Sequence, residues 1–475
     1  MPFIDRLLHW ARTEPDRDAV VVGDIRITYG ELADRAARLQ LPAGEMIGLL
    51  IDHPADFVVA FTAVVGRGRC AAVLDSGWPN DLQYRILDAL EPDAVLTSTR
   101  LAQTSAGAYV AGTALSDAPA DARFYCGFTS GTSGVPKGFV RTVGSWSKSL
   151  ERSVDWFGLT PGLRVFAPGP LAASLTLYAL AESLYSGATF HSAPPGTPMA
   201  RGPAMAQVLR SERIEHFIGV PSALRLALGR LLGELPYLRT VVSGGSKLSA
   251  AETAIIRRRA PAARVFEYYG ASELSLVTVR RADGAAGDDV GHPFPGVEIR
   301  IDADDLTNKP GGTGTIQVLT DTAIEGYLFG DDGRAFQRHG NWVTVQDRGW
   351  IDDDGALHLT GRHGDMVVVA GTNVYPSEIE TILARAGYPA AVVLGIPDVH
   401  RGYVLAAVIE APPETVLDAV GLRFRLKQLL PAVKVPQRLF RTVCLPLTAA
   451  GKPDRMALEA AVRAGGGGGV IEPFC

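Results

Sequence analysis

The stretch FTSGTSGVPKG, residues 128–138, places hydroxyl side chains, glycines, a proline and a lysine within eleven residues. Its glycines let the backbone adopt positive φ and approach an anion closely. Its hydroxyls and the Lys137 ammonium are donors that suit a phosphate. The stretch breaks the Walker A pattern, because Pro136 stands where the second glycine would fall and Gly138 follows the lysine. It predicts either a phosphate loop of another kind or an ordinary surface turn.

The surrounding sequence favours the phosphate loop. An apolar run, RFYCGF at residues 123–128, leads directly into the glycines and would anchor them as a strand. Further runs at residues 214–221, 238–245 and 263–270 read as strands that each end in polar or glycine-rich loops. Because ligands bind at the carboxyl ends of strands in open α/β sheets, these loops are expected to meet at one site.

The order of patterns along the chain predicts the fold class and the domains. Strand and helix patterns alternate in the N-terminal part, which is typical of parallel-rich sheets covered by helices. Short alternating strands predict a β-subdomain at about residues 296–361 within an N-terminal domain at 1–362. Mixed helix and strand patterns predict a small α+β domain at 363–464, and the glycines of residues 465–475 indicate a flexible tail.

Composition excludes several function classes. The chain has 475 residues, 47% of them hydrophobic, and a net charge of -5 that gives no footprint for nucleic acid. No apolar run reaches the length that a membrane span needs, and the N-terminus is expected to be an amphipathic helix, not a signal peptide. The four cysteines are far apart, which fits a cytoplasmic protein without a zinc site or disulfide framework. They are Cys70, Cys126, Cys444 and Cys475.

All eleven positions of FTSGTSGVPKG agree with the phosphate loop of the adenylate-forming superfamily, which the chain resembles. Four further stretches resemble the motifs of that superfamily in the same order: VSGGSKL (242–248), YYGASE (268–273), the long stretch at 345–380, and PLTAAGKPDR (446–455). The resemblance covers roughly residues 20–455. Its details are most similar to the acyl- and aryl-CoA synthetase branch.

The resemblance implies a set of site residues. Lys452 would be the catalytic lysine, Ser272 would contact the α-phosphate, and Glu273 with Thr129 would hold Mg²⁺. Asp347 would take the ribose hydroxyls, since its two acceptor oxygens suit a vicinal diol. The residues expected to bind the nucleotide are Thr129, Ser130, Gly131, Thr132, Ser133, Gly134, Lys137, Gly244, Tyr268, Tyr269, Gly270, Asp347 and Arg362.

The activity that the resemblance implies uses ATP, Mg²⁺ and a thiol. A carboxylic acid would attack the α-phosphate of ATP and form an acyl adenylate, which CoA or the phosphopantetheine of a carrier protein would then take up. The C-terminal domain would rotate at Asp365 between the two steps. Gly371 would line the tunnel through which the thiol enters.

The sequence departs from the superfamily pattern at two places that concern the acid. The N-terminal region is short, and Ala172, Ala173 and Ser174 stand where an aromatic gate is usual, with no aromatic before Tyr178. The ribose motif has Val345 and Gln346 in place of Thr-Gly. The apolar, small residues of the expected pocket favour an aromatic or medium-length apolar acid.

Three enzymatic alternatives stay open on the sequence. The acyl group could pass to CoA, or to a separate carrier protein in a biosynthetic pathway of secondary metabolism. The fold could instead activate nitrite for diazotisation of an arylamine. A catalytically silent binding protein is disfavoured by the presence of Lys137, Glu273 and Lys452.

Overall fold

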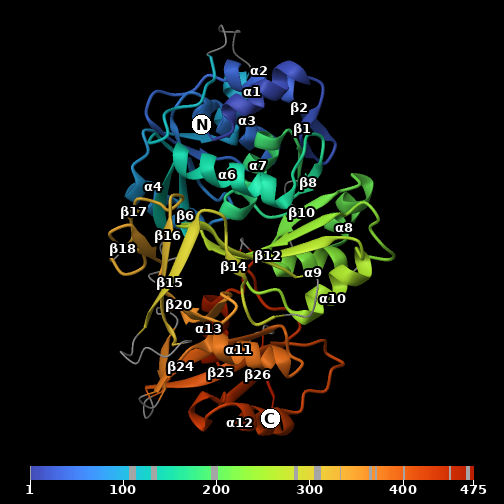
Figure 1. Cartoon of the computed structure of the whole chain (residues 1–475), viewed down its shortest axis with the longest axis vertical. Helices are drawn as coiled ribbons and strands as arrows, with labels where there is room; N and C mark the ends of the chain where they lie inside the picture. The colour runs from blue at the N-terminus through green and yellow to red at the C-terminus, as the bar shows by residue number, and fades with distance from the viewer. Residues whose placement is uncertain are drawn as a thin grey trace.

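The computed structural model shows an elongated molecule with its two ends formed by the N-terminal and C-terminal parts of the chain (Figure 1). It describes residues 2–105, 114–129, 136–193, 202–229, 231–282, 287–303, 312–331, 333–362, 366–369, 372–398, 402–448, 451–466 and 471–474.

The largest sheet has the strand order β14-β13-β12-β11-β10-β8-β9-β1-β2, and its central strands β12 to β1 run parallel. Its strands are β1 (Asp18–Val22), β2 (Ile25–Thr28), β8 (Arg164–Phe166), β9 (Thr189–Ser192), β10 (His216–Gly219), β11 (Thr240–Ser243), β12 (Arg264–Ala271), β13 (Ser275–Arg281) and β14 (His292–Pro293).

A second sheet has the order β17-β7-β6-β4-β3-β5 and carries the glycine-rich loop between β6 and β7. Its strands are β3 (Met46–Leu50), β4 (Cys70–Val73), β5 (Ala94–Thr97), β6 (Arg123–Thr129), β7 (Lys137–Thr142) and β17 (Tyr327–Phe329). Strand β17 joins the edge from almost two hundred residues further along the chain.

Helices pack against both of these sheets. They are α1 (Ile4–Thr13), α2 (Tyr29–Arg38), α3 (Pro54–Gly66), α4 (Asn80–Leu90), α5 (Ser98–Ser105), α6 (Val143–Phe157), α7 (Ser174–Ser186), α8 (Gly202–Ser211), α9 (Pro221–Gly229) and α10 (Ala250–Arg259). Because successive strand residues point to opposite faces, Ile218 of β10 packs in the core with α6 and α7, whereas Phe217 packs in the core with α8, α9 and α10.

The β-subdomain has the strand order β18-β19-β16-β20-β21, with β15 also pairing with β16. Its strands are β15 (Val297–Ala303), β16 (Gly314–Thr320), β18 (Gln337–His339), β19 (Trp342–Thr344), β20 (Asp347–Ile351) and β21 (Leu357–Arg362). The pairings in this sheet are antiparallel.

The C-terminal part is a smaller α+β unit. Its elements are β22 (Val367–Val369), β23 (Thr372–Val374), α11 (Pro376–Arg385), β24 (Ala391–Asp398), β25 (Gly402–Glu410), α12 (Ala419–Leu429), the 3-10 turn η2 (Ala432–Lys434), β26 (Arg438–Thr442), α13 (Arg455–Arg463) and β27 (Glu472–Pro473). Helices α11 and α12 pack on one face of the sheet and α13 on the other.

The fold class expected from the sequence is confirmed: parallel-rich sheets and a β-subdomain precede a small α+β unit. The chain after the run of glycines differs from the expected flexible tail. Strand β27 pairs with β26, and Ile471 is 1% exposed in the C-terminal core. A buried isoleucine therefore returns the chain to the sheet, which the glycine composition did not indicate.

Candidate functional site

The glycine-rich loop is held between two paired strands. Thr129 ends β6 and lies opposite Lys137, the first residue of β7. The expected phosphate-binding residues between them, Ser130, Gly131, Thr132, Ser133 and Gly134, lie outside the described residues. The hairpin fixes both ends of the loop at the carboxyl end of β6, where the sequence predicted a phosphate.

Tyr327 of β17 connects three of the expected site residues. Its hydroxyl donates a hydrogen bond to the carboxylate of Glu273 and lies 3.5 Å from Thr129 Oγ1. The ammonium of Lys137 lies 5.4 Å from the centre of the Tyr327 ring, within cation–π range, and 3.7 Å from the carboxylate of Asp331. The tyrosine thus brings a carboxylate, a hydroxyl and an ammonium to one edge of the loop.

The donor set around Tyr327 fits magnesium. Mg²⁺ binds oxygen ligands and commonly takes only one or two protein carboxylates, with phosphates and waters completing its shell. The Glu273 carboxylate, 6% exposed, and the Thr129 hydroxyl are oxygen donors of that kind. Across the described ranges no three His, Cys, Asp or Glu side chains form a metal site. An ion held here would therefore depend on the phosphates of a nucleotide.

A second pair of expected residues lies between the largest sheet and the β-subdomain. The hydroxyl of Tyr269 donates a hydrogen bond of 2.6 Å to Oδ2 of Asp347, which is 8% exposed. Asp347 starts β20 and lies opposite Arg362 of β21, whose side chain is outside the description. A Cβ on Gly270 would come within 2.2 Å of the Ser275 carbonyl oxygen, so only glycine fits at that position.

Ser272 belongs to a chain of hydroxyls. It donates a hydrogen bond of 3.1 Å to the hydroxyl of Ser174, which lies 3.2 Å from the hydroxyl of Tyr125. Burial raises the pKa of Tyr125, so this phenol stays neutral. Ser174 is the first residue of α7. The stretch at 172–174, which lacks the usual aromatic gate, therefore places a hydroxyl beside Ser272.

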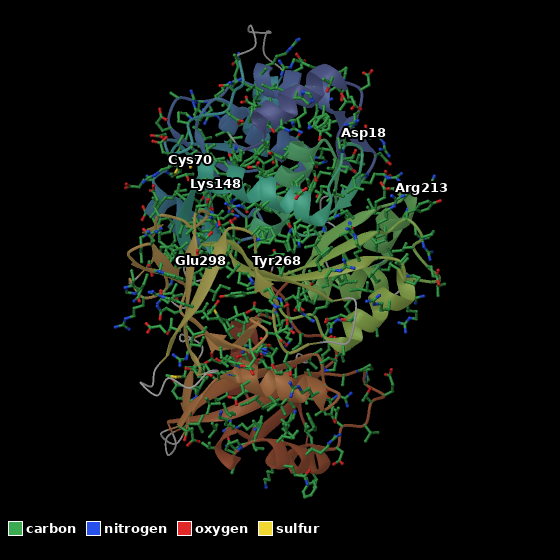
Figure 2. The ribbon with its side chains drawn as sticks, in the orientation of Figure 1. Asp18, Cys70, Lys148, Arg213, Tyr268 and Glu298 are labelled. Atoms are coloured by element: carbon green, nitrogen blue, oxygen red, sulfur yellow. The ribbon has the colours of Figure 1, made fainter. Side chains whose placement is uncertain are left out.

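The glycine turn after β11 packs against the aromatic residue that precedes the Y-G-x-S-E motif. A Cβ on Gly244 would lie 2.3 Å from Cε1 of the Tyr268 ring. Figure 2 labels Tyr268 near the middle of the long axis, between the N-terminal sheets and the C-terminal unit. Burial raises the pKa of Tyr268, which keeps its hydroxyl protonated. The absence of a side chain on Gly244 is what lets the ring lie on the turn.

Lys452 reaches the same glycine turn from the C-terminal unit. Its Cε lies 3.4 Å from the position that a Cβ on Gly245 would take. The lysine sits on a closed loop, in which the backbone N–H of Thr448 donates a 2.8 Å hydrogen bond to its carbonyl. The hydroxyl of Ser222 at the start of α9 donates a hydrogen bond of 2.6 Å to the Gly451 carbonyl. That bond attaches the lysine loop to the N-terminal domain.

Two ion pairs also connect the N-terminal domain to the C-terminal unit. Arg225 of α9 lies 3.2 Å from the carboxylate of Glu410, and Arg385 of α11 pairs with Asp288. These pairs and the Ser222 bond keep Lys452 at the glycine turn. The expected hinge residue Asp365 and the expected tunnel residue Gly371 lie outside the described residues.

Sequence reasoning missed Tyr327 and Asp331, and it assigned no contact to Ser174 or Ser222. Each is a single polar or aromatic residue outside the recognised motifs, and each reaches the site through tertiary contacts. For Ser222 the only signal in the sequence was a polar residue directly after a predicted strand. For Ser174 it was a polar residue at the start of a helix.

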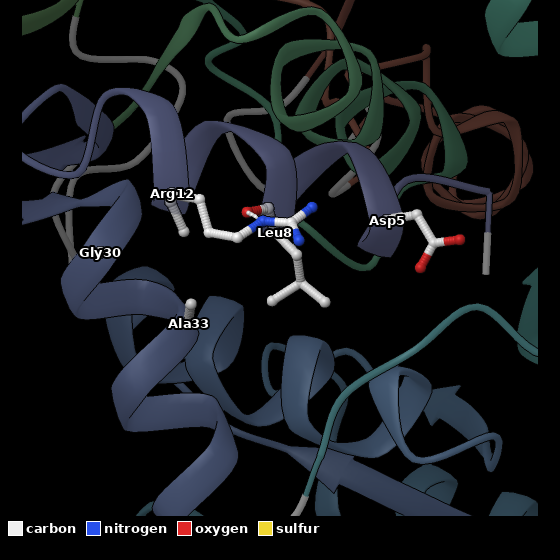
Figure 3. Close-up of a pocket in the computed structure, with 6 residues that line it drawn as sticks. Asp5, Leu8, Arg12, Gly30 and Ala33 are labelled. Carbon is white, nitrogen blue, oxygen red and sulfur yellow. Dashed lines mark hydrogen bonds between the residues drawn. The ribbon is translucent and has the colours of Figure 1, made fainter.

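A separate hollow of about 590 Å³ lies between α1 and α2 (Figure 3). These helices lie at the opposite end of the N-terminal domain from Tyr268 (Figures 1 and 2). Asp5, Leu8, Ala11, Arg12, Gly30 and Ala33 line it. None of these residues belongs to the expected site. Among the helices of the described residues, none is long and apolar enough to cross a membrane.

The fold is that of adenylate-forming enzymes. The fold matches that of o-succinylbenzoate CoA synthetase (MenE) of Bacillus subtilis with its acyl-adenylate intermediate, with a TM-score of 0.81 at 23% identity over 96% of this chain and 97% of that one. A sequence model described as AMP-binding enzyme matches residues 7–328. The chain belongs to this AMP-binding enzyme family.

Relatives of this chain match it over nearly its whole length. A putative long chain fatty acid-CoA ligase, VraA of Staphylococcus haemolyticus, is 28% identical over 97% of this chain and 98% of its own length. The uncharacterised acyl-CoA ligase YhfT of Bacillus subtilis is 29% identical over 94% of this chain and 96% of its own length. The expected membership of the adenylate-forming superfamily is confirmed.

Proposed function

We propose that the protein activates a carboxylic acid with ATP and Mg²⁺ and transfers the acyl group to the thiol of CoA. The placement of Lys452 carries this proposal: a loop of the C-terminal unit brings its side chain to Gly245, next to Gly244, which packs against the Tyr268 ring. The names of the relatives VraA and YhfT support CoA as the thiol.

In the first step a carboxylate oxygen would attack the α-phosphorus of ATP. A new P–O bond forms, the bond to the β-phosphate oxygen breaks, and pyrophosphate leaves with that electron pair. Both reactants are anions, so positive charge at the reacting oxygens lowers the barrier. Lys452 would supply that charge to the carboxylate and the α-phosphate, while Lys137 and the loop after Thr129 would hold the leaving pyrophosphate.

The other contacts assign the remaining parts of the nucleotide. The Asp347 carboxylate, held by Tyr269, would accept hydrogen bonds from the ribose hydroxyls. Glu273 and Thr129 would hold Mg²⁺, which draws negative charge off the phosphates when it is bound. In the second step the thiol loses its proton to solvent and its sulfur attacks the acyl carbon. A C–S bond forms, and AMP leaves with the electron pair of the broken C–O bond.

The acid is proposed to be aromatic or of medium length and apolar. The side of the site near Tyr268 is formed by a glycine turn and an aromatic ring, and Ala172 and Ala173 add little bulk. The dispersed cysteines support the proposal that the enzyme is cytoplasmic.

A pyrophosphate-release screen over a panel of acids tests the function. We expect release with an aromatic or medium-length acid and a thioester with CoA. Thioester formation only with a holo carrier protein, or release only with nitrite plus an arylamine, would instead favour one of the two sequence-based alternatives.

Lys452→Ala tests the role of the lysine. It should lower adenylation about a hundredfold or more, as removal of a charge-stabilising donor typically does. Thioester formation from preformed acyl adenylate should be much less affected. Lys427→Ala, at an exposed lysine of α12, is the matched control and should leave both steps unchanged. Unchanged adenylation in Lys452→Ala would refute the proposed mechanism.

A further inference from the structure

Arg141 of β7 is a fully buried arginine that no motif accounts for. It is 2% exposed and lies four residues after Lys137, on the strand that leaves the phosphate loop. Burial lowers the pKa of Arg141 to about 10, and the nearby Glu273 carboxylate opposes that shift, so the guanidinium stays charged at neutral pH. A buried charge is costly unless hydrogen bonds compensate it.

The guanidinium donates hydrogen bonds to backbone oxygens of two separate segments. Nη2 donates a hydrogen bond of 2.5 Å to the carbonyl of Ser272, and Nη1 donates one to the carbonyl of Thr322. In the described part of the chain no carboxylate lies within ion-pair distance of Arg141. The arginine thus binds the backbones of two loops of the site; it does not pair with one carboxylate.

Three consecutive carbonyls of the Ser272 segment are held, one by Arg141 and two by the Thr322 segment. Arg141 holds the Ser272 carbonyl, the backbone N–H of Ile324 donates a 2.8 Å hydrogen bond to the Glu273 carbonyl, and the Thr322 hydroxyl donates one of 2.9 Å to the Leu274 carbonyl. Because Arg141 also binds the Thr322 carbonyl, its removal would leave both the Ser272–Glu273 turn and the Thr322 segment less firmly held. The hydroxyl of Ser272 and the carboxylate of Glu273 are carried on this turn.

We propose that Arg141 is a positioning residue for nucleotide and metal binding: it ties the Ser272–Glu273 turn to the strand that begins at Lys137. The inference rests on the proposed function, since it assumes that this turn faces Mg·ATP. Arginine suits the task because its planar fork can reach two acceptors on different segments, which the single ammonium of lysine cannot do with the same geometry.

The test compares Arg141→Lys and Arg141→Met with Arg67→Lys in the full chain. Arg67 is the matched control, because it too donates to backbone carbonyls, those of Leu39 and Ala37 at 2.7 and 2.8 Å, but lies at the end of α3 away from the site. Calorimetric titration with Mg·ATP gives the dissociation constant without knowledge of the acid. Thermal melting reports any general loss of stability.

We expect Arg141→Lys to bind Mg·ATP about tenfold or more weakly, the fold-change that corresponds to the loss of a charge-assisted hydrogen bond. Once an acid is known, the KM for ATP should rise more than kcat falls. Arg141→Met should bind more weakly still, whereas Arg67→Lys should change melting without changing affinity.

Equal Mg·ATP affinity of wild type, Arg141→Lys and Arg67→Lys would overturn the inference, as would equal weakening in both lysine variants. If Arg141→Met does not fold, Arg141→Lys alone decides between these results. A wild-type protein that fails to bind Mg·ATP would instead overturn the proposed function, and the inference with it.

Discussion

Glu182 of α7 makes the stability of the protein depend on pH in a calculable way. Its side chain is 2% exposed, and within the described residues its Oε1 has no hydrogen-bond partner. Burial raises the pKa of Glu182 to about 7, and a hydrogen bond from Ser153 on α6 only partly opposes that effect. The native protein therefore keeps this carboxyl protonated at pH values where the unfolded chain ionises it.

The sign follows from proton linkage. The pKa is higher in the folded state, so the contribution of Glu182 to stability is full below about pH 4.5 and is lost as the pH rises toward 7. From a pKa of 4.5 in the unfolded chain and about 7 in the folded one, the loss between pH 5 and pH 8 is on the order of 2 to 3 kcal/mol. Glu182→Gln removes the titrating group at almost unchanged volume.

Denaturant unfolding of wild type and Glu182→Gln at pH 5, 6, 7 and 8 measures this effect. The free energy of unfolding of the variant should gain on the order of 2 to 3 kcal/mol on that of the wild type between pH 5 and pH 8. Glu151→Gln, at an exposed position of α6, is the control and should show a constant difference. A difference for Glu182→Gln that does not change with pH would refute the reasoning. So would a difference that moves in the opposite direction, since that would mean the carboxylate is ionised and partnered.

Three further changes test other contacts. Tyr327→Phe removes the hydroxyl that meets Glu273, so half-maximal pyrophosphate release should need about tenfold more Mg²⁺, with no change expected if the hydroxyl is dispensable. His216→Leu removes a buried histidine, and burial lowers the pKa of that histidine to about 3. Because the folded state resists protonation of His216, the wild type loses stability as the pH falls below 6.5. In unfolding experiments the variant should therefore gain about 2 kcal/mol on the wild type between pH 7.5 and pH 5. Gly244→Ala would press a methyl group against the Tyr268 ring, so the activity ranking of the acid panel should change; an unchanged ranking would separate this ring from the acid.

The sequence by itself determined the class of the fold and predicted the main residues of the proposed site. The runs that end at Gly245 and Gly270 could be read as strands followed by loops, because apolar strands and glycine turns are local patterns. The motifs around Lys137, Ser272 and Lys452 were recognisable for the same reason: each is a short contiguous stretch. Their convergence followed from the rule that ligands bind at the carboxyl ends of parallel strands.

The tertiary structure decided which other residues complete the site. Tyr327 meets Glu273 only because β17 pairs with β7 across almost two hundred residues, and Arg141 reaches the Ser272 carbonyl from a different sheet. Such contacts depend on strand register and on side-chain packing between distant segments, which leave no local pattern in the sequence. The same holds for Ile471, because a glycine-rich sequence gives no sign that this side chain is buried. Its burial accompanies the pairing of β27 with β26, a strand about thirty residues earlier.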